Sequence, residues 1–418
     1  MQSPQGICPA GLWKRVGMAV DLQAFYDQYP YPPPVADLDA YRRRWQESAR
    51  RRADFHLFWP TRPYREDDSI LVAGCGTSQA AKYAIRWPAA QITGIDLSAT
   101  SLRHTQELKR KYQLDNLQVH QLPLERAGEL GKSFDQVVCT GVLHHLADPD
   151  VGLRALRGVL EPHGALHLMV YAPYGRAGIY MLQEFCRRVG FRAPDGDIRE
   201  LQAALEALPS RHPLTSLLQE APDFGNGAAL ADALLNPQDR AYSVPQLLAF
   251  LKGNGLVFGR WVRQAPYSLQ PGLMSRIPRS LRPAQIPIED QYAAAELFRG
   301  NIVRHSAIAY RNDDPGIPRI SFEGDAWLDY VPIRLPDTVT LREQLPSGIA
   351  AILINRTHSH PDILLPLRPP EIGLLEAVDG RRKIGEMLAS EAEREAARSL
   401  FERLWWHDQV TFDAAPRR

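Results

Sequence analysis

The sequence has few cysteines, no long apolar run and almost no net charge, and each of these absences excludes a class of protein. Its 418 residues include 4 cysteines, which lie far apart without a Cys-x-x-Cys pair, so neither a disulfide framework nor a zinc knuckle is expected. No apolar run approaches the roughly 20 residues needed to cross a bilayer, and the N-terminus lacks the apolar core of a signal peptide. We therefore expect a cytoplasmic protein with no membrane partner.

Positive and negative side chains are almost balanced, with Lys+Arg 49 against Asp+Glu 48 and a formal net charge of +1. No field of the whole protein attracts nucleic acid, so such a partner is disfavoured unless a local patch binds it. Two arginine triplets, 42–44 and 50–52, could form that patch on one helical face. The alternative is a solvated helical face with Trp45, Ala49 and Phe55 turned inward.

The length suits about two to four domains, and the hydrophobic fraction of 44% is enough for sizeable cores. Changes in periodicity divide the chain into parts. These parts are residues 1–20, whose lack of periodicity suits a disordered start, an N-terminal helical lid at 21–68, a main α/β domain at 69–312, and a C-terminal accessory domain at 313–418.

In the main domain, short apolar runs alternate with segments of helical periodicity. The runs that we expect to be strands lie at 70–72, 91–95, 117–120, 134–139 and 165–171. Strands that alternate with helices predict a doubly wound, parallel sheet of Rossmann-like type. Two later runs, 256–264 and 302–310, could extend the same sheet, which would leave 173–250 and 266–300 as helical insertions where a substrate enters.

The C-terminal part begins with two strand-like stretches, 330–334 and 350–355. It ends in three helix candidates and a short strand, at 370–378, 383–390, 391–405 and 409–412. Three helices followed by a strand indicate a small winged-helix-like α+β domain.

The strongest chemical signal is a glycine turn after the first predicted strand, paired with an acidic residue at the end of the second. The turn is Val72-Ala73-Gly74-Cys75-Gly76-Thr77, and Asp96 lies 22 residues after Gly74. Glycines let a ligand approach the backbone, and a carboxylate at this place can accept both hydroxyls of a ribose. The pattern predicts a nucleoside pocket, with an ordinary tight turn as the alternative. A dinucleotide fingerprint needs a third glycine where this chain has Gln79, so NAD(P) is disfavoured.

This stretch resembles motif I of the class I S-adenosylmethionine-dependent methyltransferases, and Asp96 matches their second, acidic motif. The runs at 134–135, 141–146 and 160–164 resemble the family's fourth-strand motif and the turn before its fifth strand. The segment Tyr-Asp-Gln-Tyr-Pro-Tyr-Pro at 26–32 resembles an N-terminal segment of a bacterial subgroup. The resemblance implies an enzyme that uses S-adenosyl-L-methionine as its cofactor. The candidates for cofactor contact are Tyr26, Tyr31, Ala73, Gly74, Cys75, Gly76, Thr77, Gln79, Asp96, Leu97, Gln121, Leu122, Gly141 and Val142.

Three positions depart from the family's pattern. Val72 replaces an acidic residue before the glycines, Ser78 replaces the motif's last glycine, and Pro123 stands where many members place an Asp that meets the adenine amine. Gln79, Gln121 and backbone groups could substitute for the missing contacts.

His144 and His145 follow the fourth predicted strand, where the resemblance places the reacting methyl group. A histidine has an unperturbed pKa near 6.5, so one of the two could remove a proton from the acceptor. Packing of the loop is the alternative. Tyr26, Tyr29 and Tyr31 could form an aromatic lid that attracts the sulfonium, or a simple hydrophobic staple.

The sequence thus predicts a methyltransferase that moves a methyl group by SN2 displacement to an N or O nucleophile of a peptide, protein or small-molecule acceptor. Arg304 and His305 on the last predicted strand could line the acceptor pocket. No metal-ligand set is predicted, and neither the acceptor nor the oligomeric state follows from the sequence. Two alternatives remain: a non-catalytic S-adenosylmethionine sensor or scaffold, which the missing acid at Val72 favours, and an RNA methyltransferase that uses residues 42–52.

Overall fold

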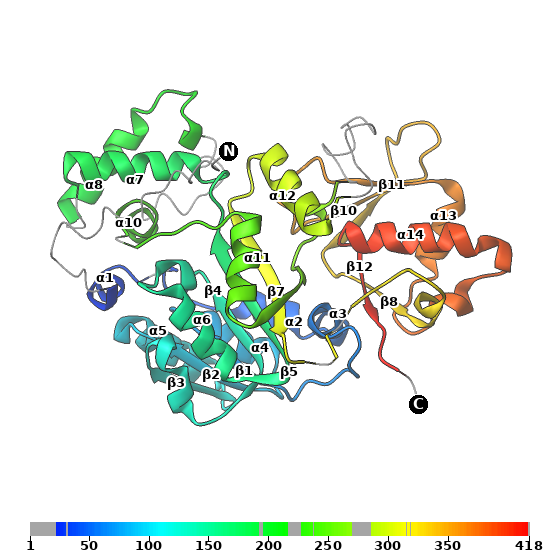
Figure 1. The fold of residues 1–418 in the computed structure, drawn as a ribbon, viewed down its shortest axis with the longest axis horizontal. Coiled ribbons are helices and arrows are strands. Elements are labelled where there is room, and N and C mark those ends of the chain that lie inside the picture. Colours follow the sequence, from blue (N-terminus) through cyan, green and yellow to red (C-terminus); the bar gives the residue numbers. More distant parts are fainter. Residues whose placement is uncertain are drawn as a thin grey trace, which may run out of the picture.

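The computed structural model places a central sheet between a small helical layer and a C-terminal domain (Figure 1). The residues that it describes are 22–30, 32–191, 195–215, 227–236, 238–269, 286–314, 316–317 and 319–416. The expectation for residues 1–20 lies outside these residues. No helix within the described ranges is both long enough and apolar enough to span a membrane.

The central sheet has seven strands in the order β3-β2-β1-β4-β5-β7-β6. They are β1 (Ser69–Ala73), β2 (Gln91–Asp96), β3 (Leu117–Gln121), β4 (Phe134–Thr140), β5 (Leu160–Tyr171), β6 (Leu256–Trp261) and β7 (Arg304–Arg311). The first five run parallel, and β7 is antiparallel to both β5 and β6. The predicted doubly wound, Rossmann-like sheet is confirmed, and the two later runs do extend it.

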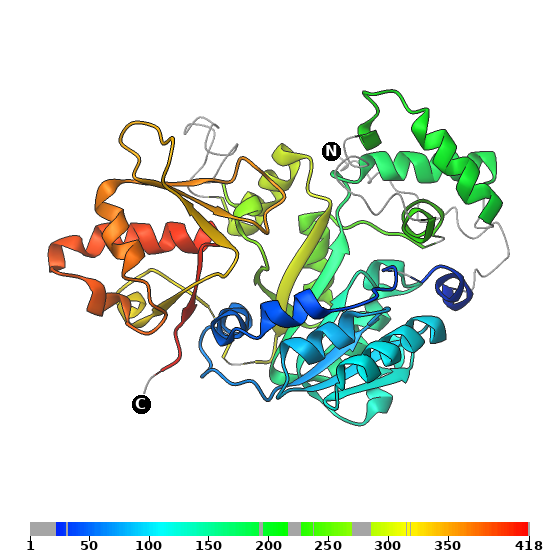
Figure 2. The ribbon, with the colours of Figure 1, turned by 180° about the vertical axis from the view of Figure 1, so that it is seen from behind.

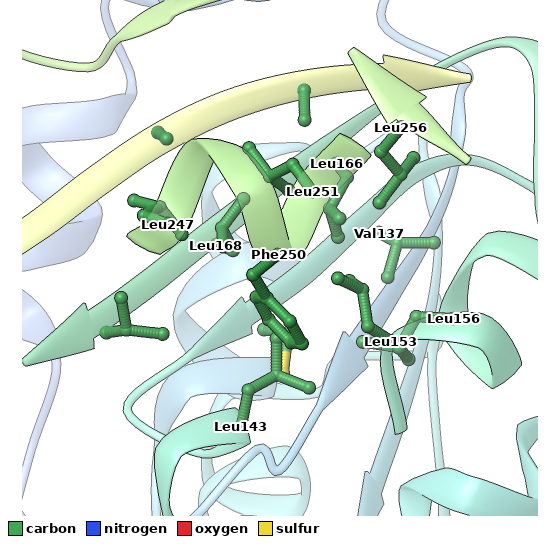
Figure 3. Close-up of a cluster of buried hydrophobic side chains, with 14 of the residues drawn as sticks. Val137, Leu143, Leu153, Leu156, Leu166, Leu168, Leu247, Phe250, Leu251 and Leu256 are labelled. Atoms are coloured by element: carbon green, nitrogen blue, oxygen red, sulfur yellow. The ribbon is translucent and has the colours of Figure 1, made fainter. Parts of the chain in front are cut away.

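Helices cover both faces of this sheet because its strands are apolar on both sides. One face packs against α3 (Ser48–Phe58), α4 (Gln79–Arg86) and α5 (Ala99–Tyr112). The other packs against α6 (Pro149–Gly158), α11 (Val244–Gly253) and α12 (Ile288–Arg299). Figure 3 shows strand residues such as Leu166 and Leu168 meeting Leu153 of α6 and Leu247 of α11. The helix α11, expected inside the insertion, therefore belongs to the covering layer of the sheet.

Local signals explain why two of these helices begin where they do. Ser98 caps α5, because its side chain accepts a hydrogen bond from the Ser101 N–H. Asp148 caps α6 by accepting from the Asp150 and Val151 N–H groups, and Pro149 occupies the first turn. Both caps lie at the carboxyl edge of the parallel strands, so they also fix the loops that follow β2 and β4.

A small helical layer joins the N-terminus to the insertion. It consists of α1 (Leu22–Gln28), α7 (Ala177–Val189), α8 (Asp195–Glu206) and α10 (Gly227–Leu235). Phe25 and Tyr29 of the N-terminal segment share one apolar cluster with Ile179, Leu201 and Leu230. The two views in Figures 1 and 2 place this layer beyond the end of the sheet that faces away from the C-terminal domain. The predicted lid at 21–68 is therefore divided, because α2 (Asp39–Trp45) and α3 lie at the other side, near the C-terminal domain.

The C-terminal domain contains two small antiparallel sheets. Its elements are β8 (Val331–Arg334), β9 (Thr338–Leu341), β10 (Ala351–Asn355), β11 (Leu365–Leu367), α13 (Pro369–Glu376), α14 (Arg394–Trp406) and β12 (Val410–Asp413). One sheet has the order β11-β10-β9 and the other pairs β12 with β8. The helix predicted at 383–390 is wrong. Only a 3₁₀ turn, Ile384–Met387, forms there, because Gly385 lowers the helix propensity of a short segment.

Charged groups fasten this domain to the rest of the molecule. Asp408 is fully buried, accepts hydrogen bonds from the Gln264 and Ala265 N–H groups at 3.1 Å, and lies 2.9 Å from His358 Nε2. Burial alone would raise the pKa of Asp408, but the hydrogen bond from His358 and the charge of Arg260 outweigh it and hold this pKa below its usual value. Asp408 therefore bridges the segment after β6 and the C-terminal domain as a carboxylate.

The arginine triplets lie at the same junction. Arg44 and Arg50 both pair with Asp337, and Arg52 Nη2 lies 2.9 Å from Asp413 Oδ2. These three guanidinium groups bind the C-terminal domain of their own chain, while Arg42 and Arg43 are exposed on α2.

Candidate active site

The turn after β1 brings three elements together at the carboxyl end of the sheet. Gly74 and Gly76 have φ values of +68° and +55°, which residues with a side chain rarely adopt. The Gly74 and Cys75 N–H groups donate to the Ile95 carbonyl of β2 at 2.8 and 3.0 Å. A Cβ added to Gly74 would lie 2.3 Å from Val142 Cγ2, so only glycine allows the loop after β4 to approach this closely.

Asp96 lies directly beside this turn. Its Oδ2 accepts a hydrogen bond from the Gly76 N–H at 2.7 Å, and its Oδ1 accepts one from the Ser98 N–H at 2.9 Å. Burial raises the pKa of Asp96, while these backbone hydrogen bonds oppose the rise. The carboxylate is thus held in one orientation, and each oxygen keeps a lone pair for a further donor.

A cavity of about 1260 Å³ opens beside the turn and extends to the C-terminal domain. Ligand pockets usually measure about 300–1,000 Å³, so this one has room for a nucleoside cofactor and an acceptor. Leu97, Leu122 and Pro123 give an apolar wall next to Asp96, as a flat base beside a ribose requires. The residues present therefore fit an adenosyl group.

Most of the residues predicted from the sequence line this cavity. They are Tyr26, Gly74, Cys75, Gly76, Gln79, Asp96, Leu97, Leu122, Gly141, Val142 and His145. Tyr31 lies outside the described residues.

Four predicted residues do not line the cavity. Ala73 is buried in β1, Thr77 Oγ1 donates to the Pro32 carbonyl at 2.8 Å, and Gln121 Nε2 donates to the Leu97 carbonyl at 3.1 Å. His144 is also buried and does not line the cavity. The Thr77 hydroxyl and the Gln121 amide nitrogen are thus already paired within the chain, and packing encloses Ala73 and His144.

The two histidines differ in a way that the sequence does not reveal. His145 lines the cavity, and its Nδ1 donates to the Gln238 carbonyl at 2.7 Å, which leaves the Nε2 lone pair free to accept a proton. The ring of His144 lies against that of Tyr171 at a tilt of 47°, with the centroids 4.1 Å apart, and neither of its nitrogens has a hydrogen-bond partner among the described residues. Burial, with the charges of His145 and Arg176, lowers the pKa of His144 well below its usual value. Only His145 is placed to act as a base.

His144, His145 and Asp239 also form a group whose possible metal-ligand atoms lie within 4.8 Å of one another. The sequence predicts no such group, because Asp239 is far away in the chain. A guanidinium group already lies beside Asp239. Arg176 Nη2 lies 3.6 Å from Asp239 Oδ2, and the same Arg176 covers the ring of Tyr171 at 3.5 Å. The Asp239 carboxylate, which a metal ion would need as a ligand, therefore already has a cation beside it, the Arg176 guanidinium.

The N-terminal segment is tied to the cavity by hydrogen bonds that sequence reasoning missed. The Tyr26 hydroxyl donates to Asp232 Oδ1 at 3.0 Å, and Asp27 Oδ1 accepts from Ser98 Oγ at 2.6 Å. Burial, followed by the charge of Asp232, raises the pKa of Tyr26 well above its usual value. Asp27 stands inside the recognised Tyr-Asp-Gln-Tyr segment and could have been singled out there, whereas nothing in the sequence pairs Asp232 with Tyr26.

Comparison with known proteins identifies this edge of the sheet. Residues 71–166, from β1 to β5, match the family described as a methyltransferase domain. This part of the chain is therefore a methyltransferase domain. The glycine turn and Asp96 of this domain are the residues already placed at the mouth of the cavity.

Relatives of the methyltransferase domain differ in how much of the chain they match. An uncharacterized protein of Synechococcus sp. is 36% identical over 250 residues, which is 57% of this chain and 58% of that protein. A ubiquinone biosynthesis O-methyltransferase of Albidiferax ferrireducens is 36% identical over 96 residues, or 23% of this chain and 38% of the enzyme. The chain thus spans less than two thirds of these relatives.

A solved structure extends the likeness beyond this domain. PKMT2 from Rickettsia typhi covers 92% of this chain and 77% of its own with a TM-score of 0.59. At 17% identity this likeness shows the fold alone.

Proposed function

We propose that the protein transfers the methyl group of S-adenosyl-L-methionine to an N or O nucleophile of a peptide, protein or small-molecule acceptor. The observation that carries this proposal is the Asp96 carboxylate, held by the Gly76 N–H at the mouth of a cavity large enough for both reactants. S-adenosylmethionine supplies an activated methyl group, so the protein's task is alignment and proton removal.

A residue of the cavity can be assigned to each part of this task. Asp96 accepts the ribose hydroxyls, and Leu97, Leu122 and Pro123 enclose the base. His145 Nε2 accepts the proton that an acceptor hydroxyl or ammonium must lose, while the Gln238 carbonyl keeps the ring in the required tautomer.

The names of the curated relatives support an oxygen nucleophile, since several are ubiquinone biosynthesis O-methyltransferases. The RNA alternative has less support, because three of the six arginines in its two triplets, Arg44, Arg50 and Arg52, are engaged with acidic groups of the C-terminal domain. The sensor alternative assigns no chemical role to the Nε2 atom of His145 at the cavity wall.

The test combines binding and transfer. S-adenosylmethionine and S-adenosylhomocysteine should both bind in calorimetry, and cell lysate incubated with the protein and a tritiated methyl donor should yield a labelled fraction. Tight binding with no label in any fraction would support the sensor, and absence of binding would refute the cofactor site itself.

Replacement of His145 by glutamine should lower turnover by about 100-fold or more, the usual contribution of a general base. The glutamine amide can still donate to the Gln238 carbonyl, so the melting temperature should change little. His144→Gln is the matched comparison, because this buried neighbour should affect the melting temperature more than the chemistry. Turnover by His145→Gln equal to that of the parent protein would show that the proton leaves by another route.

A further inference from the structure

The end of the cavity that meets the C-terminal domain has more cations than carboxylates. Seven Lys or Arg and five Asp or Glu side chains line the whole cavity, and six of the former and two of the latter belong to α2, α3, α4, the segment after β6, β7 and the segment at 335–337. They are Arg44, Arg50, Lys82, Arg86, Arg263 and Arg304, against Asp54 and Asp337. Walls of low dielectric concentrate the field of such an excess, so this region attracts negative charge.

Three of these cations already have carboxylate partners. Arg86 Nη1 lies 3.2 Å from Asp54 Oδ2. Arg44 and Arg50 share Asp337, with Arg50 Nη1 3.1 Å from its Oδ2. One carboxylate between two guanidinium groups leaves positive charge in excess even at this paired site.

The other three cations, Lys82, Arg263 and Arg304, form no ion pair with any residue that the structure describes. Arg263 donates from Nε to Thr357 Oγ1 at 2.5 Å and from Nη1 to the Val262 carbonyl at 3.0 Å, and both of these acceptors are neutral. Its Nη2 remains available. Arg304 is exposed at the start of β7, where it faces the register position of Tyr171 on β5.

Burial and the neighbouring cations together lower the pKa values of two titratable groups in this region. Burial, and then the nearby Arg86, lower the pKa of Lys82. Burial, followed by the charges of Arg86 and Arg263, lowers the pKa of His167 to about 3. His167 is therefore neutral among these cations, and its Nδ1 is buried with no hydrogen-bond partner in the described part of the chain. A bound anion would stabilise the charged form of Lys82.

We infer that this end of the cavity binds an anionic group, and that the methyl acceptor carries a carboxylate or a phosphate held by Lys82, Arg263 and Arg304. The inference rests on the proposed function, because it names the acceptor class for the same cavity. Arginine suits anionic oxygens because it presents several N–H donors, and lysine adds a compact charge. Trp45 and Tyr83 line the same region and offer contact to an apolar body of the acceptor.

The same charges disfavour a cationic acceptor. A free ammonium group that entered from the C-terminal side would approach several unneutralised cations at close range, where like charges repel strongly in a partly dry site. The end of the cavity that meets the C-terminal domain therefore favours acceptors with negative charge, and it does so before their nucleophile reaches His145.

The test uses the full chain saturated with S-adenosylhomocysteine, so that the site for the cofactor's own carboxylate is filled first. Inorganic phosphate and benzoate are then titrated separately in calorimetry at constant ionic strength. We expect at least one probe to bind. Arg304→Gln and Arg263→Gln should each lower its affinity about tenfold, which is the usual effect of losing one charged hydrogen bond. Lys82→Met should weaken the same probe. Binding of phosphate alone or of benzoate alone tells which acidic group the site prefers.

Arg126→Gln is the matched control, because Arg126 is exposed on the 3₁₀ segment Leu124–Leu130, pairs with Glu129 and does not line the cavity. It should leave the probe's affinity unchanged. Equal affinities in the three cavity variants and this control, or no binding of either probe, would overturn the inference. Binding of S-adenosylhomocysteine in the first step tests the proposed function separately, so the two failures can be told apart.

Discussion

Replacement of Asp96 by alanine should weaken the binding of S-adenosylhomocysteine by about 100-fold or more. Two hydrogen bonds between a carboxylate and ribose hydroxyls contribute about 1.5–3 kcal/mol each, and each 1.4 kcal/mol corresponds to a factor of ten. The substitution also leaves the Gly76 and Ser98 N–H groups without their acceptor. Because these groups fix the turn that a nucleoside approaches, the loss should fall on affinity, and calorimetry at constant pH and ionic strength measures it directly.

Two further variants separate this effect from a general loss of structure. Asp96→Asn keeps the shape and one carbonyl acceptor, so its affinity should lie between that of the parent protein and that of Asp96→Ala. Asp115→Ala removes an exposed carboxylate from the turn after α5 and should leave affinity unchanged. An unaltered affinity of Asp96→Ala, with an unaltered melting temperature, would mean that the carboxylate does not bind the cofactor.

Acidification from pH 6.5 to pH 4.5 should reduce the free energy of unfolding steeply. Burial lowers the pKa of His56, His360 and His407 to about 4 and that of His167 to about 3. An unfolded histidine has a pKa near 6.5, so below that pH the unfolded chain binds protons that the folded protein does not. Asp68 acts in the opposite direction, because burial raises its pKa to about 6 and it takes up a proton in the folded state.

The balance of these groups gives the size of the effect. With His144, whose pKa burial also lowers, five histidine protons less one carboxyl proton leave about four, and each contributes about 1.4 kcal/mol per pH unit, so stability should fall by about 5 kcal/mol per pH unit near pH 5. Domains are typically stable by only about 5–15 kcal/mol, so the protein should unfold before pH 4. Urea unfolding at several pH values measures the slope.

A pair of histidine variants checks the assignment. His407→Gln removes one buried histidine and should reduce the slope by about one proton, or about 1.4 kcal/mol per pH unit. His120→Gln, at an exposed position of β3, should leave it unchanged. A slope that His407→Gln does not alter would show that the buried histidine is not the source.

The sheet and the cofactor edge could be predicted from the sequence because their signals are local. Strand runs, the glycine turn and Asp96 follow one another within a short stretch, and α5 (Ala99–Tyr112) lies between the second and third predicted strands, where a helix is expected to alternate with them. The cap at Ser98 and the left-handed residue Gln113 mark both ends of that helix. Here local and tertiary preferences agree, so a single sequence is sufficient.

The remaining features depend on contacts between distant segments. Nothing local separates His144 from His145, because only the carbonyl of Gln238 and the ring of Tyr171 give them different surroundings. The arginine triplets have the composition of a phosphate-binding face, yet Asp337 of the C-terminal domain neutralises two of their members. The spacing of polar residues along the chain predicts which face of a helix is polar. Which group that face contacts depends on the fold.

The bridge at Asp408 has a consequence for how the molecule could change over time. It secures Gln264 and Ala265 to a domain whose loop at 355–360 supplies part of the cavity wall, while the glycine turn and Asp96 lie on the sheet. The cavity wall therefore comes from two parts of the chain, and Asp408 holds the C-terminal part in place. Asp96 and the proposed anion contacts Lys82, Arg263 and Arg304 all lie outside the C-terminal domain. Exchanging that domain for the tail of a related chain, with the Asp408 bridge retained, would therefore alter the shape of the acceptor end without removing these contacts.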